Sequence, residues 1–470
     1  MHSHSPRDPM TIETRVDPAT THTPAPWTVL PPVERRPNIP AGFAAGGIPA
    51  GIKASGRPDL AVVLPTSGRA AAAAVFTPNA FAAAPVLLSR RNLADSAPAG
   101  GGRYGWTAGI VSTSGCANAA TGPEGESDQA TVAALVASAL GVEAGDILCL
   151  STGLIGTRLP LDRVETGIVA LVPDGLTTTD DGLLGAAEAL CTTDSVTKVA
   201  TTTIALPSPG GENVTVTVSG IAKGVGMIHP RMATMLAIVL TDAGADPATL
   251  SALLRPAAAR TWDQLTVDGD TSTNDTVFLL ASGASGASAV QAATPEAKAL
   301  GRAIEAVARD LARQQAADGE GATTLITCHV AGAADDADGR AVARAVVASS
   351  LVKAAVHGRD PNWGRIVGAA GNAQLADAAV LEAAGLSPAD ARARGGTRLT
   401  VDPARLRVAL AGHVVYDGGA VAFDRAAARA AMDAPEFVIG LDLGVGQGVG
   451  EAFGCDLTEA YVVENSEYTT

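Results

Sequence analysis

The sequence predicts an α/β fold, because strand-like apolar runs alternate with segments of helical periodicity along most of its length. The clearest strand is the apolar run at 235–240, which is bounded by loop signals and is typical of a strand buried on both faces. The clearest helices are at 161–171 and 295–316, where apolar residues recur at helical spacing. Of the 470 residues 47% are hydrophobic and 17% charged, which fits a folded protein of two or three domains.

The N-terminal half opens with a segment of different composition. Residues 1–37 are rich in Pro, Thr and His and are expected to form a disordered tail. Strands are then expected at 59–64, 71–76, 84–88, 109–113 and 147–150. A helix is expected at 128–140, with Gly141 as its stop signal.

The second half divides at a polar stretch. A hairpin is expected around the loop 206–212, and further elements are helices at 246–259 and 295–316 and a strand at 324–330. Residues 331–340 are polar and mark a boundary between a main unit, 38–340, and a smaller C-terminal unit, 341–470. The glycine-rich stretch 444–450 lacks the G-x-G-x-x-G spacing of dinucleotide-binding loops, so a strand connection is expected there.

Charge and cysteine usage narrow the classes of partner. The net charge of −15 and the absence of basic runs argue against nucleic acid. No apolar stretch is long enough to span a membrane and no signal-peptide core is present, so a cytoplasmic location is expected. The carboxylates at 266–275 lack calcium-loop spacing, so this loop is expected to lie beside a functional site without binding a metal. The cysteines form no C-x-x-C pair, which suits reduced structural thiols; they are Cys116, Cys149, Cys191, Cys328 and Cys455.

The segment from Lys223 to Leu236, near the middle of the chain, allows two interpretations. Gly224, Gly226 and Pro230 predict a tight loop in front of the buried strand. In one interpretation Thr234 merely begins that strand, as β-branched residues often do. In the other, the chain is cut just before it. Thr234 is then an N-terminal nucleophile whose freed amine, with a pKa of about 8, accepts the hydroxyl proton.

The stretch Gly226-Met-Ile-His-Pro-Arg-Met-Ala-Thr-Met-Leu236 closely resembles the self-cleavage segment of the ornithine acetyltransferase family, the glutamate N-acetyltransferases of arginine biosynthesis. The resemblance extends from about residue 39 to residue 470 through separated motifs in family order. These motifs are at 50–57, 75–79, 151–156, 191–195, 318–323, 358–365 and 454–470.

The resemblance implies a fold and a processing event. The fold would have mixed sheets layered between helices, in an ornithine acetyltransferase-like N-terminal-nucleophile arrangement with a smaller C-terminal α/β domain. Self-cleavage between Ala233 and Thr234 would give an α and a β chain that stay together, and two such pairs would form an α2β2 heterotetramer. No cofactor would be needed, although acetyl-CoA would be a co-substrate in a bifunctional form.

The resemblance also assigns site residues. Thr234 would be the nucleophile of a ping-pong transfer of acetyl from N2-acetylornithine to glutamate, and Thr152 and Gly153 would stabilise the oxyanion, an effect typically worth 100- to 1000-fold in rate. The substrate-binding residues would be Thr192, Lys223, Thr234, Glu320, Asn465 and Thr470.

Three alternatives stay open at the level of sequence. One is the bifunctional form that also uses acetyl-CoA to acetylate glutamate. A second is a paralogue of a secondary-metabolite pathway with another acyl donor or acceptor, suggested by departures from the family pattern at Cys116, Ser195, Arg231 and Thr324. The third is a different class, namely an N-terminal-nucleophile peptidase or an uncleaved binding protein.

Overall fold

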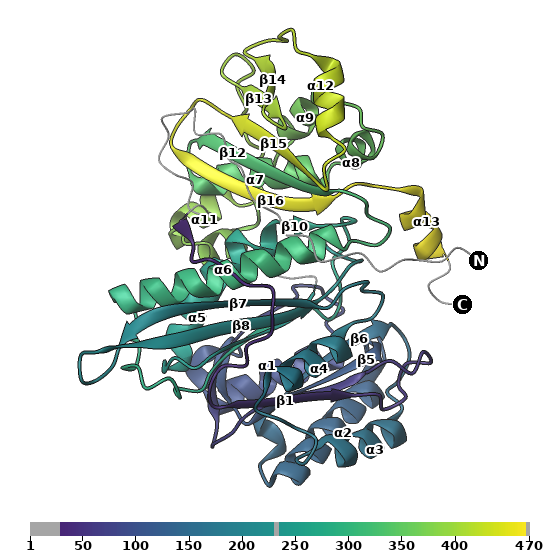
Figure 1. Cartoon of the computed structure of the whole chain (residues 1–470), viewed down its shortest axis with the longest axis vertical. Helices are drawn as coiled ribbons and strands as arrows, with labels where there is room; N and C mark the ends of the chain where they lie inside the picture. The colour runs from purple at the N-terminus through teal and green to yellow at the C-terminus, as the bar shows by residue number, and fades with distance from the viewer. Residues whose placement is uncertain (1–28, 230–234, 467–470) are drawn as a thin grey trace.

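The computed structural model describes residues 29–229 and 235–466 and contains three β-sheets with helices between and around them (Figure 1). The sheets mix parallel and antiparallel pairs, which confirms the predicted α/β class with mixed sheets layered between helices.

The N-terminal sheet has the strand order β1-β2-β5-β6. Its strands are β1 (Phe43–Ile48), β2 (Leu60–Pro65), β5 (Gly109–Cys116) and β6 (Ile147–Leu154). One face packs on α2 (Gly122–Leu140) and α3 (Leu161–Leu171). The other face packs on α1 (Ala84–Ser96) and α4 (Asp180–Leu190), which share one apolar core with the next sheet.

The middle sheet has the order β4-β3-β11-β9-β8-β7. Its strands are β4 (Tyr104–Thr107), β3 (Ala70–Phe76), β11 (Thr276–Ala281), β9 (Leu236–Thr241), β8 (Asn213–Lys223) and β7 (Lys198–Pro207). The central pair β9 and β11 is parallel, and every other neighbouring pair is antiparallel. All six residues of β9 are buried, as its continuous apolar sequence predicts. On the far side the sheet packs against α5 (Pro247–Arg260) and α6 (Pro295–Ala317).

The C-terminal sheet has the order β10-β16-β12-β15-β13-β14, and α6 lies between it and the middle sheet (Figure 1). Its strands are β10 (Leu265–Thr266), β16 (Gly448–Cys455), β12 (Leu325–Ala333), β15 (Glu436–Asp442), β13 (Arg407–Leu410) and β14 (His413–Asp417). The helices in this part are α7 (Asp336–Ala348), α8 (Ser350–His357), α9 (Trp363–Ala370), α10 (Ala378–Ala383), α11 (Pro388–Arg394), α12 (Arg425–Ala431) and α13 (Glu459–Ser466). Because β12 is an interior strand here, this sheet starts upstream of the boundary predicted at residue 340.

Local sequence signals placed most elements well. Gly141 ends α2 in the left-handed conformation with φ 68°, as a glycine stop signal predicts. The hairpin around 206–212 is confirmed as the β7–β8 connection. The stretch 444–450 connects β15 to β16 as expected, although its last three residues already belong to β16.

The strand predicted at 84–88 is wrong, because this segment is the first turn and a half of helix α1. Pro85 occupies the first turn, where its missing N–H costs nothing, and Leu and Arg residues carry the helix on to Ser96. Part of the predicted tail also differs, since Glu34 and Thr201 exchange backbone hydrogen bonds of 2.8 and 2.9 Å beside β7. Residues 1–28 lie outside the described part of the chain.

Candidate active site

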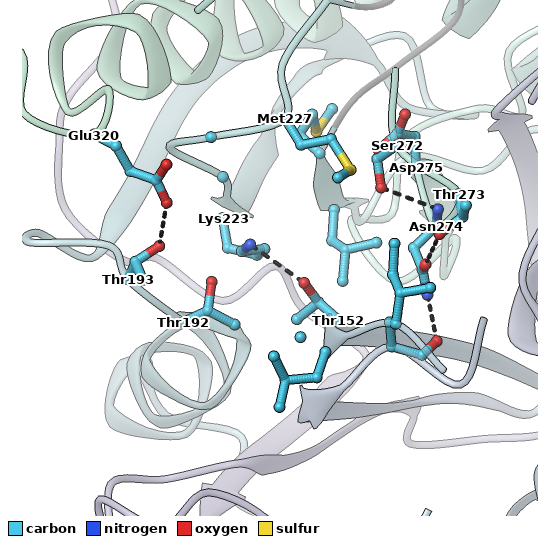
Figure 2. A pocket seen from close by; sticks show the side chains of 18 of the residues that line it. Thr152, Thr192, Thr193, Lys223, Met227, Ser272, Thr273, Asn274, Asp275 and Glu320 are labelled. Atoms are coloured by element: carbon cyan, nitrogen blue, oxygen red, sulfur yellow. Dashed lines mark hydrogen bonds between the residues drawn. The ribbon is translucent and has the colours of Figure 1, made fainter. Parts of the chain in front are cut away.

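A cavity of about 300 Å³ lies where the ends of β6 and β8 meet the segment after α6 (Figure 2). Its polar lining side chains are Thr152, Thr192, Thr193, Lys223, Ser272, Thr273, Asn274, Asp275, Glu320 and Asn465. Its apolar lining side chains include Leu154, Ile155, Met227, Met235 and Leu236. The cavity therefore combines one cationic and two anionic groups with an apolar wall, which suits a small charged molecule that also carries apolar carbon.

Thr152 and Gly153 lie at the carboxyl end of β6, beside an irregularity in the β5–β6 register at Gly115 and Cys116. Gly153 has φ 128°, and a Cβ there would lie 2.3 Å from the carbonyl carbon of Gly115. Only glycine fits this position, because any side chain would be strained and would overlap the neighbouring strand. Both Thr152 and Gly153 line the cavity.

Lys223 is the last residue of β8, and its Nζ lies 3.3 Å from Thr152 Oγ1 (Figure 2). The peptide group that joins Lys223 to Gly224 is fixed at both its oxygen and its nitrogen. The Nε2 of Gln315 donates to Lys223 O at 2.8 Å, and the next amide, Gly224 N, donates to Asp194 Oδ1 at 2.9 Å. The ammonium group is thus held at the same end of the cavity as the Thr152 hydroxyl.

Glu320 follows α6 and reaches the cavity from another side. Its carboxylate accepts hydrogen bonds from Thr193 Oγ1 at 3.0 Å and from Asn465 Nδ2 at 2.9 Å. A Cβ at Gly226 would lie only 2.2 Å from Glu320 Oε2, so a glycine is needed there for the carboxylate to occupy its place. The arrangement presents a negative charge that suits a cationic amine.

The chain on either side of residues 230–234 is anchored at the cavity. The amides of Met227 and Ile228 donate to Asp268 at 2.5 and 2.8 Å, and Met227 adopts φ 53°, an uncommon value for a side-chain-bearing residue. Burial raises the pKa of Asp268, although these amides and that of Asp270 oppose the effect. On the other side, Thr276 N donates to Met235 O at 3.0 Å, and Met235 lines the cavity.

Six of the predicted site residues line this one cavity. They are Thr152, Gly153, Thr192, Lys223, Glu320 and Asn465. They come from motifs spread over more than 300 positions, and only the folded chain brings them together. Ala233, Thr234 and Thr470 lie outside the described residues, and the roles of all nine remain predictions. The loop 266–275 flanks the cavity as expected, with four of its residues in the lining.

Sequence reasoning missed Asn274. Its Nδ2 donates to Ala117 O at 2.6 Å and to Ser151 O at 2.8 Å, which joins the loop 266–275 to the ends of β5 and β6 just before Thr152. An asparagine in a polar loop gives no local sign of such a role.

Sequence reasoning also missed a buried charge cluster next to the site, formed by Asp194, Lys198 and Asp318. Burial alone would raise the pKa of Asp194, but the charges of Lys198 and Lys223 outweigh it and hold the pKa below its usual value. Burial would likewise lower the pKa of Lys198, and the two carboxylates raise it instead. Both groups are therefore charged in the folded protein.

Other expectations concern thiols, metals and membranes. All five cysteines are free and buried, in agreement with the structural thiols expected from the sequence, and Cys116 Sγ donates to Thr157 O at 3.1 Å. Among residues 29–229 and 235–466, no group of three metal-binding side chains converges. Within the same residues, no helix is long and apolar enough to cross a bilayer.

Comparison with known proteins agrees with the motifs. The model of the ArgJ family matches residues 44–470. The chain belongs to the ArgJ family. The ArgJ relative from Gloeobacter violaceus, an arginine biosynthesis bifunctional protein, is 43% identical and covers 91% of this chain and 96% of its own. The ArgJ relative of the same name from Thermus thermophilus is 42% identical, and the match covers 92% of this chain and 99% of the relative.

The chain is also similar to a solved structure. Ornithine acetyltransferase from Mycobacterium tuberculosis, crystallised with ornithine, is 38% identical and covers 43% of this chain and 98% of its own, with a TM-score of 0.37. The family predicted from the motifs, and with it the acyltransferase class, is confirmed by the ArgJ match.

Proposed function

We propose that the chain transfers an acetyl group from N2-acetylornithine to glutamate through an acyl-Thr234 intermediate, in the cyclic route of arginine biosynthesis. The observation that carries this proposal is the convergence of Thr152, Gly153, Lys223 and Glu320 on the cavity that Met235 lines. Membership of the ArgJ family supports the same reaction.

The mature site first requires processing of the chain. Thr234 Oγ attacks the carbonyl carbon of Ala233, and the C–N bond breaks, so that the peptide bond becomes an ester and the Thr234 amine is freed. Water then hydrolyses the ester, which releases the Ala233 carboxylate and restores the Thr234 hydroxyl. The two products are an α chain that ends at Ala233 and a β chain that begins at Thr234. Their strands share the middle sheet, which supports their staying together as one enzyme.

Transfer then proceeds in two half-reactions. The Thr234 amine accepts the Oγ proton as Oγ attacks the acetyl carbon of N2-acetylornithine, and the tetrahedral oxyanion is held by Thr152 and Gly153. Collapse breaks the amide bond, and the leaving ornithine nitrogen takes the proton. The amine of glutamate next attacks the acyl ester, which gives N-acetylglutamate and restores Thr234.

The charges of the cavity support this substrate pair. In this proposal Glu320, which accepts a hydrogen bond from Asn465, also accepts hydrogen bonds from the cationic side-chain amine of acetylornithine. Lys223, whose Nζ lies 3.3 Å from Thr152 Oγ1, binds a substrate carboxylate. Thr192 completes the substrate contacts, and Thr470 belongs to the same proposal. No cofactor is required, the location is cytoplasmic, and the assembly is an α2β2 heterotetramer.

A second candidate is bifunctional use of acetyl-CoA as a donor to glutamate. The names of the ArgJ relatives from Gloeobacter violaceus and Thermus thermophilus, both bifunctional proteins, favour it. Turnover of glutamate with acetyl-CoA in the absence of acetylornithine would establish this activity.

The decisive experiment combines intact mass with a transfer assay. Under denaturing conditions the wild-type protein is expected to give two chains that meet at Ala233/Thr234, and Thr234→Ala is expected to give one chain and no acetyl transfer. A Thr234→Ala protein that still formed N-acetylglutamate from acetylornithine and glutamate would refute the nucleophile. A wild-type protein that stays a single 46.8 kDa chain would refute the processing step.

A further inference from the structure

Lys198 is a fully buried lysine beside the cavity that does not line it. It is the first residue of β7, and its Nζ lies 2.6 Å from Asp194 Oδ1, 2.6 Å from Asp318 Oδ2 and 3.2 Å from Val196 O. An ammonium group has three protons to donate, and all three have acceptors here. The ammonium group of Lys198 therefore has no proton left for a substrate and bonds only to other parts of the protein.

Asp194, which is held by Lys198, in turn fixes two backbone segments at the cavity, at Thr192 and at Gly224. Its Oδ2 accepts from Thr192 N at 3.0 Å, and its Oδ1 accepts from Gly224 N at 2.9 Å as well as from Lys198. Thr192 lines the cavity directly, and Gly224 follows Lys223, whose ammonium lies against Thr152. One carboxylate therefore fixes the peptide groups beside two predicted substrate contacts.

Asp318, the second carboxylate bonded to Lys198, fixes the segment that contains Glu320. Its carboxylate accepts from Ser195 N at 3.1 Å and from the Ser195 hydroxyl, so it joins the end of α6 to the loop that contains Thr192. Glu320 lies two residues further on, and its own amide donates to Val225 O at 2.8 Å. A shift of Asp318 would therefore move the Glu320 carboxylate relative to the Thr192 loop.

We propose that Lys198 is a positioning residue that holds Thr192, Lys223 and Glu320 in register around the cavity and so sets the affinity for the amino-acid substrate. Removal of its ammonium would leave Asp194 and Asp318 as buried carboxylates without their shared partner, and such groups separate or become hydrated. Misplacement of a positioning group by about 1 Å can cost on the order of 100-fold in a reaction that depends on it. The kinetic part of this proposal rests on the proposed function, whereas the structural part does not.

The test compares Lys198→Met with Lys353→Met. Lys353 is a matched control because it is also buried, but it donates to Thr266 O and Cys455 O and does not line the cavity. Lys198→Met is expected to raise KM for acetylornithine about tenfold or more with a smaller change in kcat. It is also expected to speed amide hydrogen exchange in peptides covering 191–197 and 223–227. Lys353→Met is expected to lower Tm but to leave KM and exchange in both peptides unchanged.

The outcomes separate positioning from a purely structural role. If Lys198→Met lowers Tm as Lys353→Met does but leaves KM and local exchange at wild-type values, the proposal is overturned. If Lys198→Met does not fold, Asp318→Asn takes its place, with changes in the same direction but smaller; wild-type behaviour of that variant would equally overturn the proposal. A wild-type protein without transferase activity would defeat the proposed function, and the exchange measurements would still decide on Lys198.

Discussion

The substitution Glu320→Gln tests the role in substrate selection that is proposed for the Glu320 charge. Glu320 is half-buried, and its carboxylate has two hydrogen-bond donors from the protein, Thr193 Oγ1 and Asn465 Nδ2. Glutamine keeps the size of the side chain and one acceptor oxygen. The change therefore removes the negative charge while it leaves the shape of the cavity nearly intact.

The expected effect follows from the type of bond that is lost. A hydrogen bond to a charged group is worth about 1.5–3 kcal/mol, and partial solvent exposure of Glu320 places it in the lower part of that range. At ~1.4 kcal/mol per factor of ten, ~1.5–2 kcal/mol corresponds to a rise of about 10- to 30-fold in KM for acetylornithine. Glutamate has no cationic side chain, so its KM is expected to stay the same or to fall.

Steady-state kinetics with each substrate varied in turn measure both constants. Glu464→Gln is the matched control, since Glu464 is an exposed carboxylate next to Asn465 on α13 that does not line the cavity. A surface change of this kind is expected to alter KM by no more than about twofold. An unchanged KM for acetylornithine in Glu320→Gln, or an equal rise for both substrates, would refute the assignment of Glu320 to the cationic amine.

Thr152→Ala is expected to lower kcat about 100- to 1000-fold with little change in KM, because it removes a proposed oxyanion donor; a normal kcat would contradict this role. Burial raises the pKa of Cys149 to about 12, so a thiol reagent at pH 8 should label it only after unfolding, and rapid labelling of the folded protein would show that the thiol is accessible. Burial alone would raise the pKa of Glu451, but hydrogen bonds from Arg309 and His329 hold it at about 2, below its usual 4.5. Its contribution to stability, up to ~3 kcal/mol, is therefore present above pH ~4.5 and lost as the pH falls toward 2. Thermal unfolding of Glu451→Gln between pH 5 and 2 should show a flatter pH dependence than wild type, and an equally steep one would contradict this.

Local sequence patterns correctly predicted elements that are buried along their whole length, such as β9. The strand at 236–241 is buried along its whole length, and the unbroken apolar run at 235–240 predicts this. Helix α1 was mistaken for a strand for the same reason, since 84–88 is also apolar. Its exposed face begins with the apolar Leu87 and becomes polar only at Arg90 and Arg91, so residues 84–88 by themselves show no polar face that would reveal a helix. Its length, which only the residues beyond Leu88 show, would have been the better guide.

Some residues of the candidate site can be predicted from local sequence patterns, and others cannot. Thr152 and Glu320 belong to motifs with a recognisable order of residues, and the fold brings them to one cavity. Lys198 has one partner four positions away and another 120 positions away, and no local pattern connects them. Burial of its ammonium is decided by how α6 packs on β7, which is a property of the tertiary structure alone.

The middle sheet has a further consequence for how the enzyme is made. Its two central strands, β9 and β11, come from the sequence after residue 234, and they lie between β3 and β8, which come before it. The β3–β11 and β8–β9 ladders each contain six residue pairs, and both must open before a β chain could leave. Synthesis as one precursor therefore makes the formation of this sheet independent of concentration. After the proposed cut between Ala233 and Thr234, the two chains of a denatured enzyme would have to find each other in a bimolecular step. Recovery of the enzyme would therefore fall on dilution, while that of the uncut Thr234→Ala precursor would not.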